Sequence, residues 1–132
     1  MHRLQTLLPL ALAFLFCAAS VRAQEQPRDP KILFAEVDTN GDGIVDLQEF
    51  HQRVVDVFYL VDSDKDGFLS PAELKQLPHP EQIKDVDKDG DGKVSLHEFV
   101  RIRFLQFEAA DTSHDGELSL EEVIVVYRVE GK

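Results

Sequence analysis

A twelve-residue pattern occurs four times in this 132-residue chain and constrains its fold more than any other feature. Each copy begins with Asp, ends with Glu, has Gly at position 6 and has an aliphatic residue at position 8. Asp, Asn or Ser occupies positions 3 and 5. The copies, called loops 1 to 4 below, are Asp38–Glu49, Asp62–Glu73, Asp87–Glu98 and Asp111–Glu122. Because they start every 24 or 25 residues, the chain is built from a repeated local unit.

The oxygen-bearing residues of the pattern are suited to a hard divalent cation. Ca²⁺ takes about six to eight oxygen ligands in flexible geometry, whereas Mg²⁺ demands a small octahedral shell. A Glu that binds through both carboxylate oxygens therefore favours Ca²⁺. A single copy could be a solvated acidic turn, but four complete copies in register argue against that interpretation.

In this order the residues resemble the calcium loop of the EF-hand family, over nearly all of Lys31–Tyr127. The chain is most similar to small exported bacterial EF-hand proteins, whose loops recur at this short period. The resemblance implies up to four Ca²⁺ ions, with side-chain ligands at positions 1, 3, 5, 9 and 12 and a backbone carbonyl at position 7. The implied ligands are Asp38, Asn40, Asp42, Ile44, Asp46 and Glu49; Asp62, Asp64, Asp66, Phe68, Ser70 and Glu73; Asp87, Asp89, Asp91, Lys93, Ser95 and Glu98; and Asp111, Ser113, Asp115, Glu117, Ser119 and Glu122.

The four loops differ in the number of carboxylates that they offer at these positions. Loops 1 to 3 each offer four carboxylates, whereas loop 4 offers three because Ser113 and Ser119 are neutral. Charge count therefore predicts that loop 4 binds Ca²⁺ most weakly. Positions 9 and 12 also read Ser/Asp-x-x-Glu, which is the capping-box pattern of a helix start.

Apolar residues flank every loop at helical spacing and predict a helix on each side. The segments between loops 1 and 2 (Phe50–Val61) and between loops 3 and 4 (Phe99–Ala110) contain neither Pro nor Gly. Each is only twelve residues long, about 18 Å of helix, and is predicted to be one continuous helix shared by two loops. The expected fold class is an all-α EF-hand array of short helices, without two calmodulin-like lobes.

The middle of the chain is expected to fold back on itself. Pro78-His79-Pro80 should break the helix and leave two short ones, roughly Pro71–Leu77 and Glu81–Val86. Loop 2 would then meet loop 3, and loop 1 would meet loop 4, through their aliphatic position-8 residues. The final segment, Val123–Val129, is rich in β-branched residues, but its place after a loop favours a helix.

The first 23 residues are expected to be a cleaved signal peptide. Leu7–Phe16 is a ten-residue apolar run, and Val21-Arg22-Ala23 matches a small-residue cleavage site. The alternatives are a membrane anchor, for which the fifteen-residue apolar stretch is short, and a lipoprotein attached through Cys17. Residues 24–29 read as a flexible leader, and residues 30–132 as a single domain. This interpretation places the protein in the periplasm or outside the cell, with no stable membrane anchor.

Charge and composition exclude several functions. The net charge is -11, so nucleic acid is not an expected partner. Beyond residue 23 there is no cysteine, and the histidines (His51, His79, His97 and His114) form no catalytic or metal pattern, so an enzyme is not expected. The expected function is a calcium buffer or a module that calcium folds. The alternative is a calcium sensor or adaptor that, when loaded with Ca²⁺, exposes an apolar surface of Phe58, Phe104, Phe107 and the Val123–Val129 helix to an unidentified protein partner.

Overall fold

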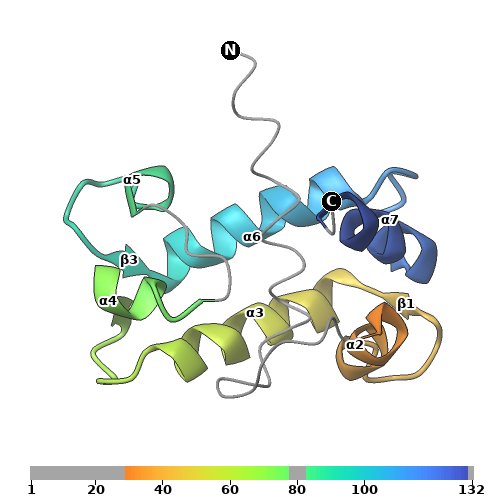
Figure 1. Ribbon diagram of the computed structural model, residues 1–132, viewed down its shortest axis with the longest axis horizontal. Coiled ribbons are helices and arrows are strands. Elements are labelled where there is room, and N and C mark those ends of the chain that lie inside the picture. Colours follow the sequence, from red (N-terminus) through yellow and green to blue (C-terminus); the bar gives the residue numbers. More distant parts are fainter. Residues whose placement is uncertain (1–28, 78–82, 131–132) are drawn as a thin grey trace, which may run out of the picture.

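Two long helices form the centre of the computed structural model, which describes residues 29–77 and 83–130 of the chain. Helix α3 (Leu47–Val61) leads from loop 1 into loop 2, and helix α6 (Leu96–Ala110) leads from loop 3 into loop 4. Each is a single helix of 15 residues, which confirms the prediction of helices shared between loops. The two helices lie side by side and run in opposite directions (Figure 1). This arrangement places loops 1 and 4 at one end of the molecule and loops 2 and 3 at the other.

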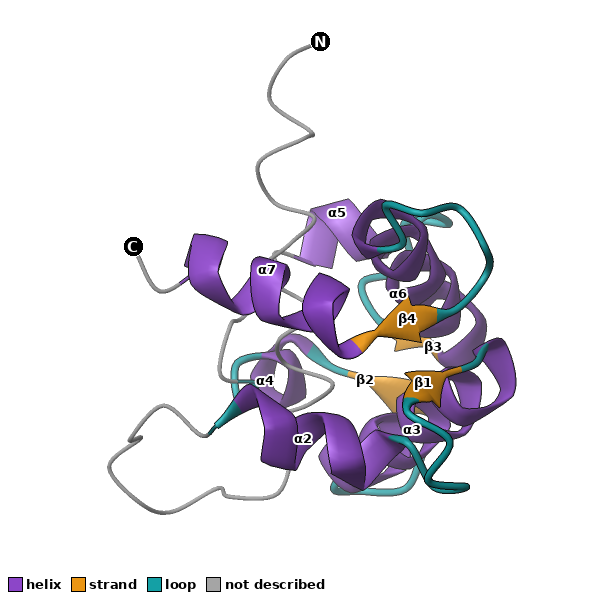
Figure 2. Ribbon diagram, turned by 90° about the vertical axis from the view of Figure 1, so that its right-hand side faces the viewer, coloured by secondary structure: helices purple, strands orange, loops and turns teal. Residues whose placement is uncertain are grey.

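The loops meet in pairs through two short antiparallel sheets (Figure 2). Strand β1 (Ile44–Val45) pairs with β4 (Leu118–Ser119), and β2 (Phe68–Leu69) pairs with β3 (Val94–Ser95). The position-8 residues are direct partners, Val45 with Leu118 and Leu69 with Val94, so the predicted pairing of loops is confirmed. The expected all-α class is confirmed in part, because the fold is mostly helical but also contains two small sheets. Adjacent loops expose short stretches of backbone, and ladder hydrogen bonds between them satisfy those groups.

Shorter helices flank the central pair. Helix α2 (Pro30–Val37) starts at the Asp29 cap, whose Oδ1 accepts a 2.9 Å hydrogen bond from the Lys31 amide. Helix α7 (Leu120–Glu130) confirms that the terminal segment is helical despite its β-branched residues. It packs against α2, so the first and last helices of the described chain meet beside loops 1 and 4.

The two short helices at the other end differ from their predicted lengths. Helix α4 (Pro71–Leu74) stops before the predicted Leu77, and residues 75–77 form a turn. Helix α5 covers Ile83–Val86. The predicted break at Pro78-His79-Pro80 and the start of the second helix at Glu81 lie outside the described residues.

Aromatic side chains join α3 to α6 near each loop pair. Phe50 contacts Phe107 at a ring-centroid distance of 4.7 Å beside loops 1 and 4, and Phe58 contacts Phe99 at 5.6 Å beside loops 2 and 3. All four rings are buried, at 2% exposure or less. In this structure Phe58 and Phe107, which belong to the surface expected for a sensor, therefore form part of the core.

One buried charge had no signal in the sequence. Arg103 of α6 is only 1% exposed, and its guanidinium carbon lies 4.6 Å from the ring centroid of Phe99. Its Nη1 donates a 3.0 Å hydrogen bond to Oε1 of Gln106. Charged residues on a helix usually mark the solvent face, so the pattern places Arg103 outside, whereas its long apolar stem and planar head pack within the core.

The aromatic contacts predict a large cost for truncating Phe50. The Phe50 ring is fully buried, and its centroid also lies 6.0 Å from that of Phe104. Replacing Phe50 by Ala should therefore lower the free energy of unfolding by about 3 kcal/mol or more. Leu105→Ala on α6 is the control, because Leu105 is 43% exposed and its loss should change stability by about 0.5 kcal/mol or less. Chemical denaturation of both variants in excess calcium measures the difference. Equal effects of the two changes would show that the aromatic contacts between α3 and α6 do not hold the helices together.

Candidate metal centre

The first carboxylate of each loop organises the loop around itself. Its Oδ2 accepts a hydrogen bond from the backbone N–H of the position-6 glycine, at 2.8 to 3.0 Å in all four loops. The chain must turn sharply to bring that N–H back to position 1. Gly92 shows how: its φ of +83° lies in the left-handed region, where a Cβ is disfavoured. The position-1 residues are Asp38, Asp62, Asp87 and Asp111.

The glutamate at position 12 ties the two ends of each loop together. Its Oε1 accepts from the backbone N–H of position 3 at 3.0 to 3.4 Å. Its Oε2 accepts from the N–H of position 9 at 2.9 to 3.3 Å. All four carboxylates are 9% exposed or less. The residues are Glu49, Glu73, Glu98 and Glu122.

Hydrogen bonds keep three of these buried carboxylates in their charged form. The N–H of Ser70 lowers the pKa of Glu73, and this effect outweighs the opposing effect of burial. Burial by itself would raise the pKa of Glu98 and of Glu122, but the hydrogen bonds from their loops reverse the direction and lower both values. Ionised oxygens are what a divalent cation needs.

The position-9 residues start the helices that leave the loops. Asp46, Ser70 and Ser95 each form a complete capping box with the glutamate three residues later, as the sequence predicts. Ser119 exchanges the same hydrogen bonds with Glu122. Position 9 therefore has a structural role in every loop, and a ligand role there stays a prediction.

Three aspartates converge in each of loops 2 and 3. Carboxylate oxygens of Asp62, Asp64 and Asp66 lie within 4.8 Å of one another, and those of Asp87, Asp89 and Asp91 do the same. The corresponding groups of loops 1 and 4 contain Asn40 and Ser113 at position 3, so they gather fewer charges.

The convergence of carboxylates raises the pKa of the aspartate at position 3 in each of these loops. The N–H of Asp66 lowers the pKa of Asp64, but burial and the negative charges of Asp66 and Glu73 outweigh that effect and raise it. Asp89 behaves in the same way: the N–H of Asp91 lowers its pKa, while burial and the charges of Asp91 and Glu98 raise it. The repulsion in both loops would be relieved by a cation.

One buried oxygen in loop 2 has no partner. Asp62 is 1% exposed, and its Oδ1 accepts no hydrogen bond within the described parts of the chain. In loops 1 and 3 the equivalent Oδ1 accepts a 2.7 Å hydrogen bond from the N–H of Gly41 or Gly90. A buried, unpartnered carboxylate oxygen beside two other carboxylates fits a hard cation such as Ca²⁺, which would supply the missing interaction.

The position-7 residues hold the turn between the ligands and the strands. The N–H of each donates to Oδ1 of the position-5 aspartate at 2.8 to 3.0 Å. The resemblance assigns their backbone carbonyls, and not their side chains, to the metal. The residues are Ile44, Phe68, Lys93 and Glu117.

Lys93 contributes a contact that sequence reasoning missed. Its Nζ lies 3.0 Å from Oδ2 of Asp66, a position-5 residue of the neighbouring loop. The contact lowers the pKa of Asp66 and raises that of Lys93. The signal was a basic residue at a position of loop 3 that faces loop 2 once the loops pair.

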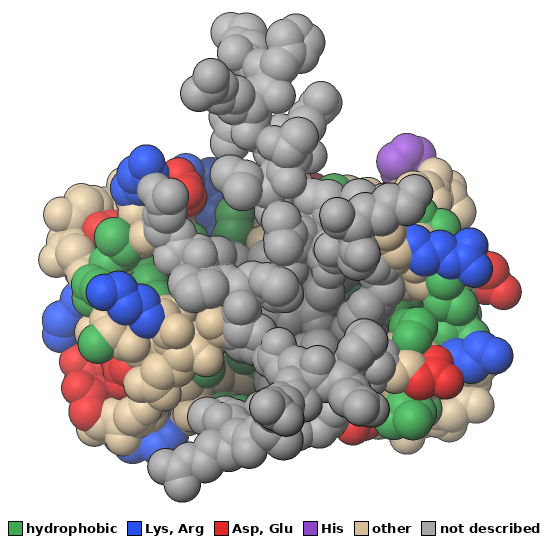
Figure 3. All heavy atoms as spheres, in the orientation of Figure 1, with side chains coloured by type: hydrophobic (Ala, Val, Ile, Leu, Met, Phe, Trp, Pro, Cys, Tyr) green, Lys and Arg blue, Asp and Glu red, His purple; other side chains and the backbone are tan. Residues whose placement is uncertain are grey.

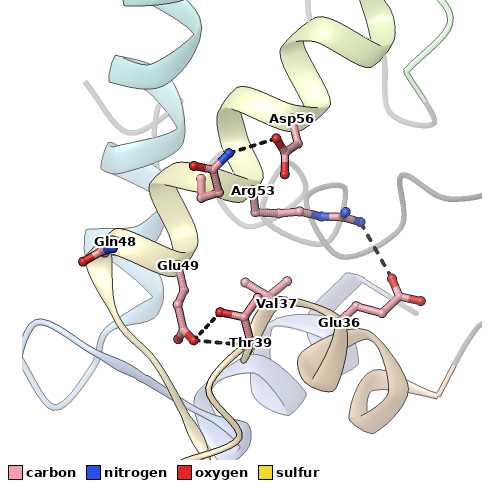
Figure 4. Close-up of a pocket in the computed structure, with 8 residues that line it drawn as sticks. Glu36, Val37, Thr39, Gln48, Glu49, Arg53 and Asp56 are labelled. Atoms are coloured by element: carbon pink, nitrogen blue, oxygen red, sulfur yellow. Dashed lines mark hydrogen bonds and ion pairs between the residues drawn. The ribbon is translucent and has the colours of Figure 1, made fainter.

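A pocket lies between α2 and α3 beside loop 1 (Figure 4). Arg53 extends from α3 toward Glu36 of α2, with 3.7 Å between the charged atoms, while the Glu49 carboxylate turns to Thr39. The pocket is lined by Glu36, Val37, Thr39, Gln48, Glu49, Gln52, Arg53 and Asp56. The two groups of three metal-binding side chains found among the residues described lie in loops 2 and 3 and include none of the pocket's acids, of which Glu49 is also the position-12 residue of loop 1.

Comparison with known protein families agrees with this geometry. A family model described as EF hand matches residues 31–55, 54–78, 81–105 and 104–126, which together make up more than half of the chain. Each match contains one loop, and consecutive matches overlap within α3 and within α6, the two shared helices. No curated protein matches the chain.

The loop geometry predicts different costs for two glycines of loop 3. Gly92→Ala should lower the free energy of unfolding by about 1 to 2 kcal/mol, because φ is +83° while no other atom lies within 4 Å of the added Cβ. Gly90→Asn is the control: position 4 of loops 2 and 4 already holds Lys65 and His114 at φ of 61° and 59°, and Asn tolerates this region. Thermal unfolding in excess calcium measures both. If Gly90→Asn lowers the melting temperature as much as Gly92→Ala, this explanation of the turn is wrong.

Proposed function

The chain belongs to the EF-hand family, and on this basis we propose that it is an exported, non-enzymatic protein that buffers Ca²⁺ or is folded by it. Its four repeats and acidic groups indicate calcium binding. The observation that carries the proposal is the buried Oδ1 of Asp62, which has no partner in the described chain and lies within a group of three aspartates.

The pairing of the loops supports calcium-dependent folding. Each sheet joins two loops directly, so a cation that orders one loop also orders its partner. The described loops hold much of the acidic charge of a chain with a net charge of -11. Binding of divalent cations offsets that repulsion only in the folded state, because the ligands of each site come together there.

Export is part of the proposal and rests on the sequence of residues 1–23, which lie outside the described structure. None of the helices in the described ranges has the length and apolarity needed to span a bilayer. We place the protein in the periplasm or outside the cell after cleavage near Ala23. Extracellular EF-type modules bind Ca²⁺ at about 10⁻⁴ to 10⁻³ M, and that range is expected here.

The alternative function is a calcium sensor or adaptor that offers an apolar surface to a protein partner. Exposed apolar side chains favour it, among them Tyr59, Leu60 and Val125, at 50%, 57% and 53% exposure. The burial of Phe58 and Phe107 supports the buffer, because the aromatic residues expected to recognise a partner already pack against the protein itself.

Replacing the position-12 glutamates one at a time tests calcium binding. Each Glu→Gln change keeps the side chain's size but removes a charge that the metal needs, so each variant should lose one binding step in calorimetric titration. The variant at Glu122 should alter the titration least, because loop 4 has the fewest carboxylates. Glu108→Gln on the exposed surface of α6 is the matched control and should bind like the parent. No heat of binding at millimolar Ca²⁺ in the parent protein would reject calcium binding altogether.

Removal of calcium should loosen the fold. A single site filled at about 100 times its dissociation constant adds about 2.7 kcal/mol, so chelation should lower the melting temperature by roughly 10 °C or more. A hydrophobic dye should then bind more strongly in chelator than in calcium, because the aromatic core opens. The sensor alternative predicts the reverse, with more dye bound in calcium. Identical melting curves and circular dichroism in both conditions would contradict calcium-dependent folding.

A further inference from the structure

Basic residues are distributed unequally between the two pairs of loops. Paired loops 1 and 4 contain nine carboxylates and no Lys or Arg, whereas paired loops 2 and 3 contain eight carboxylates and three lysines. Acidic and basic side chains lie close together at both ends of the face drawn in Figure 3, so the inequality concerns the loops themselves and not the ends as a whole. The three lysines are Lys65, Lys88 and Lys93.

Lys93 reaches from its own loop to a carboxylate of the other loop. Its Nζ lies 3.0 Å from Oδ2 of Asp66 and 5.4 Å from the ring centroid of Phe68, both in loop 2. Strands β2 and β3 hold the two loops in register, so this contact is fixed by the fold. Asp66 belongs to the loop 2 group of three aspartates whose carboxylate oxygens lie within 4.8 Å of one another. The ammonium therefore sits beside the place where a cation in loop 2 would bind.

We propose that Lys93 is a tethered cation that competes with Ca²⁺ for Asp66, so that loop 3 sets the calcium affinity of loop 2. The inference rests on the proposed calcium binding. A Ca²⁺ ion in loop 2 and the Lys93 ammonium repel each other, so binding must displace the ammonium or tolerate it. The side chains of Lys93 and Asp66 are 47% and 38% exposed, so water screens the effect and keeps it moderate.

The other pair of loops provides an internal comparison. Its register is the same, with position-8 residues opposite each other in both sheets. The residue of loop 4 that corresponds to Lys93 is Glu117. Loop 1, which has four carboxylates at ligand positions like loop 2, therefore has no lysine placed to compete with its metal. In the absence of calcium the Lys93 contact holds loops 2 and 3 together, whereas loops 1 and 4 have no such contact between oppositely charged residues in the described structure.

Lys93→Gln tests the proposal, with Lys88→Gln as its control. Lys88 carries the same charge in the same loop and forms no ion pair with a carboxylate in the described chain. The backbone amides of Gly67 and Gly92 donate to the first aspartates of loops 2 and 3, so their NMR signals report each loop separately during a calcium titration. Lys93→Gln should tighten binding at loop 2 about two- to fivefold and lower the melting temperature in chelator. Lys88→Gln should change loop 2 less, and the difference between the variants should shrink in high salt.

Moving the lysine to the other pair tests the same mechanism in reverse. Glu117→Lys should weaken calcium binding at loop 1, because it places an ammonium where Lys93 stands in the other pair. Glu121→Lys makes the same change of charge at position 11 of the same loop, where the side chain is exposed, and is the matched control. The amide of Gly43, which donates to Asp38, reports loop 1.

The outcomes separate this proposal from calcium binding itself. The proposal is wrong if Lys93→Gln and Lys88→Gln change the calcium affinity of loop 2 by the same factor, or if Lys93→Gln weakens binding there. Lys93 would then only hold the two loops together. If calcium binds to none of the loops in the parent protein, calcium binding fails and the proposal falls with it. Tighter calcium binding by Lys93→Gln, together with lower stability in chelator, supports competition. If Lys93 were purely structural, its loss would lower both the calcium affinity and the stability.

Discussion

The hydrogen bonds of the position-12 carboxylates are the interactions on which the rest of the structure depends. One oxygen of each accepts from the N–H of position 3 near the start of its loop, and the other accepts from the N–H of position 9, the residue just before the helix that follows. Burying a charge is costly unless it is fully engaged, and these groups accept several N–H donors each. A single side chain therefore closes the loop, starts the next helix and presents ionised oxygens. Loop shape and cation binding are linked because they use the same atoms.

The shared helices turn local loops into one fold. Helices α3 and α6 each have a loop at both termini, so each helix links two loops directly. The Phe50–Phe107 and Phe58–Phe99 contacts lie beside the two sheets, so each pair of loops rests on its own part of the core. A cation that fixes one pair stabilises a helix that also leads to the other pair. The short period between loops thus couples the two ends of the molecule through helices that have no break.

The sequence was informative wherever local chemistry decides the structure. Loop boundaries, the capping boxes, the shared helices and the pairing of Val45 with Leu118 all follow from spacing, capping residues and the lack of Pro and Gly in two segments. Three features were not predicted from it. The length of α4, the burial of Arg103 and the reach of Lys93 to Asp66 each depend on which side chains meet in space. Tertiary contacts of this kind leave no periodic trace, and a lone basic residue usually marks the solvent face.

The two ends of the molecule solve the same electrostatic problem in different ways. Loops 1 and 4 bring nine carboxylates together with no lysine or arginine, so within these two loops a cation from solution is the main source of neutralisation. Loops 2 and 3 carry lysines of their own, and Lys93 already touches a carboxylate of the candidate metal centre. The Lys93 ammonium reduces the repulsion between carboxylates before a metal binds. Metal binding at these loops therefore relieves less repulsion and adds less stability. The same folding unit, repeated four times, can thus give one pair of loops whose order depends strongly on calcium and another whose order depends on it less.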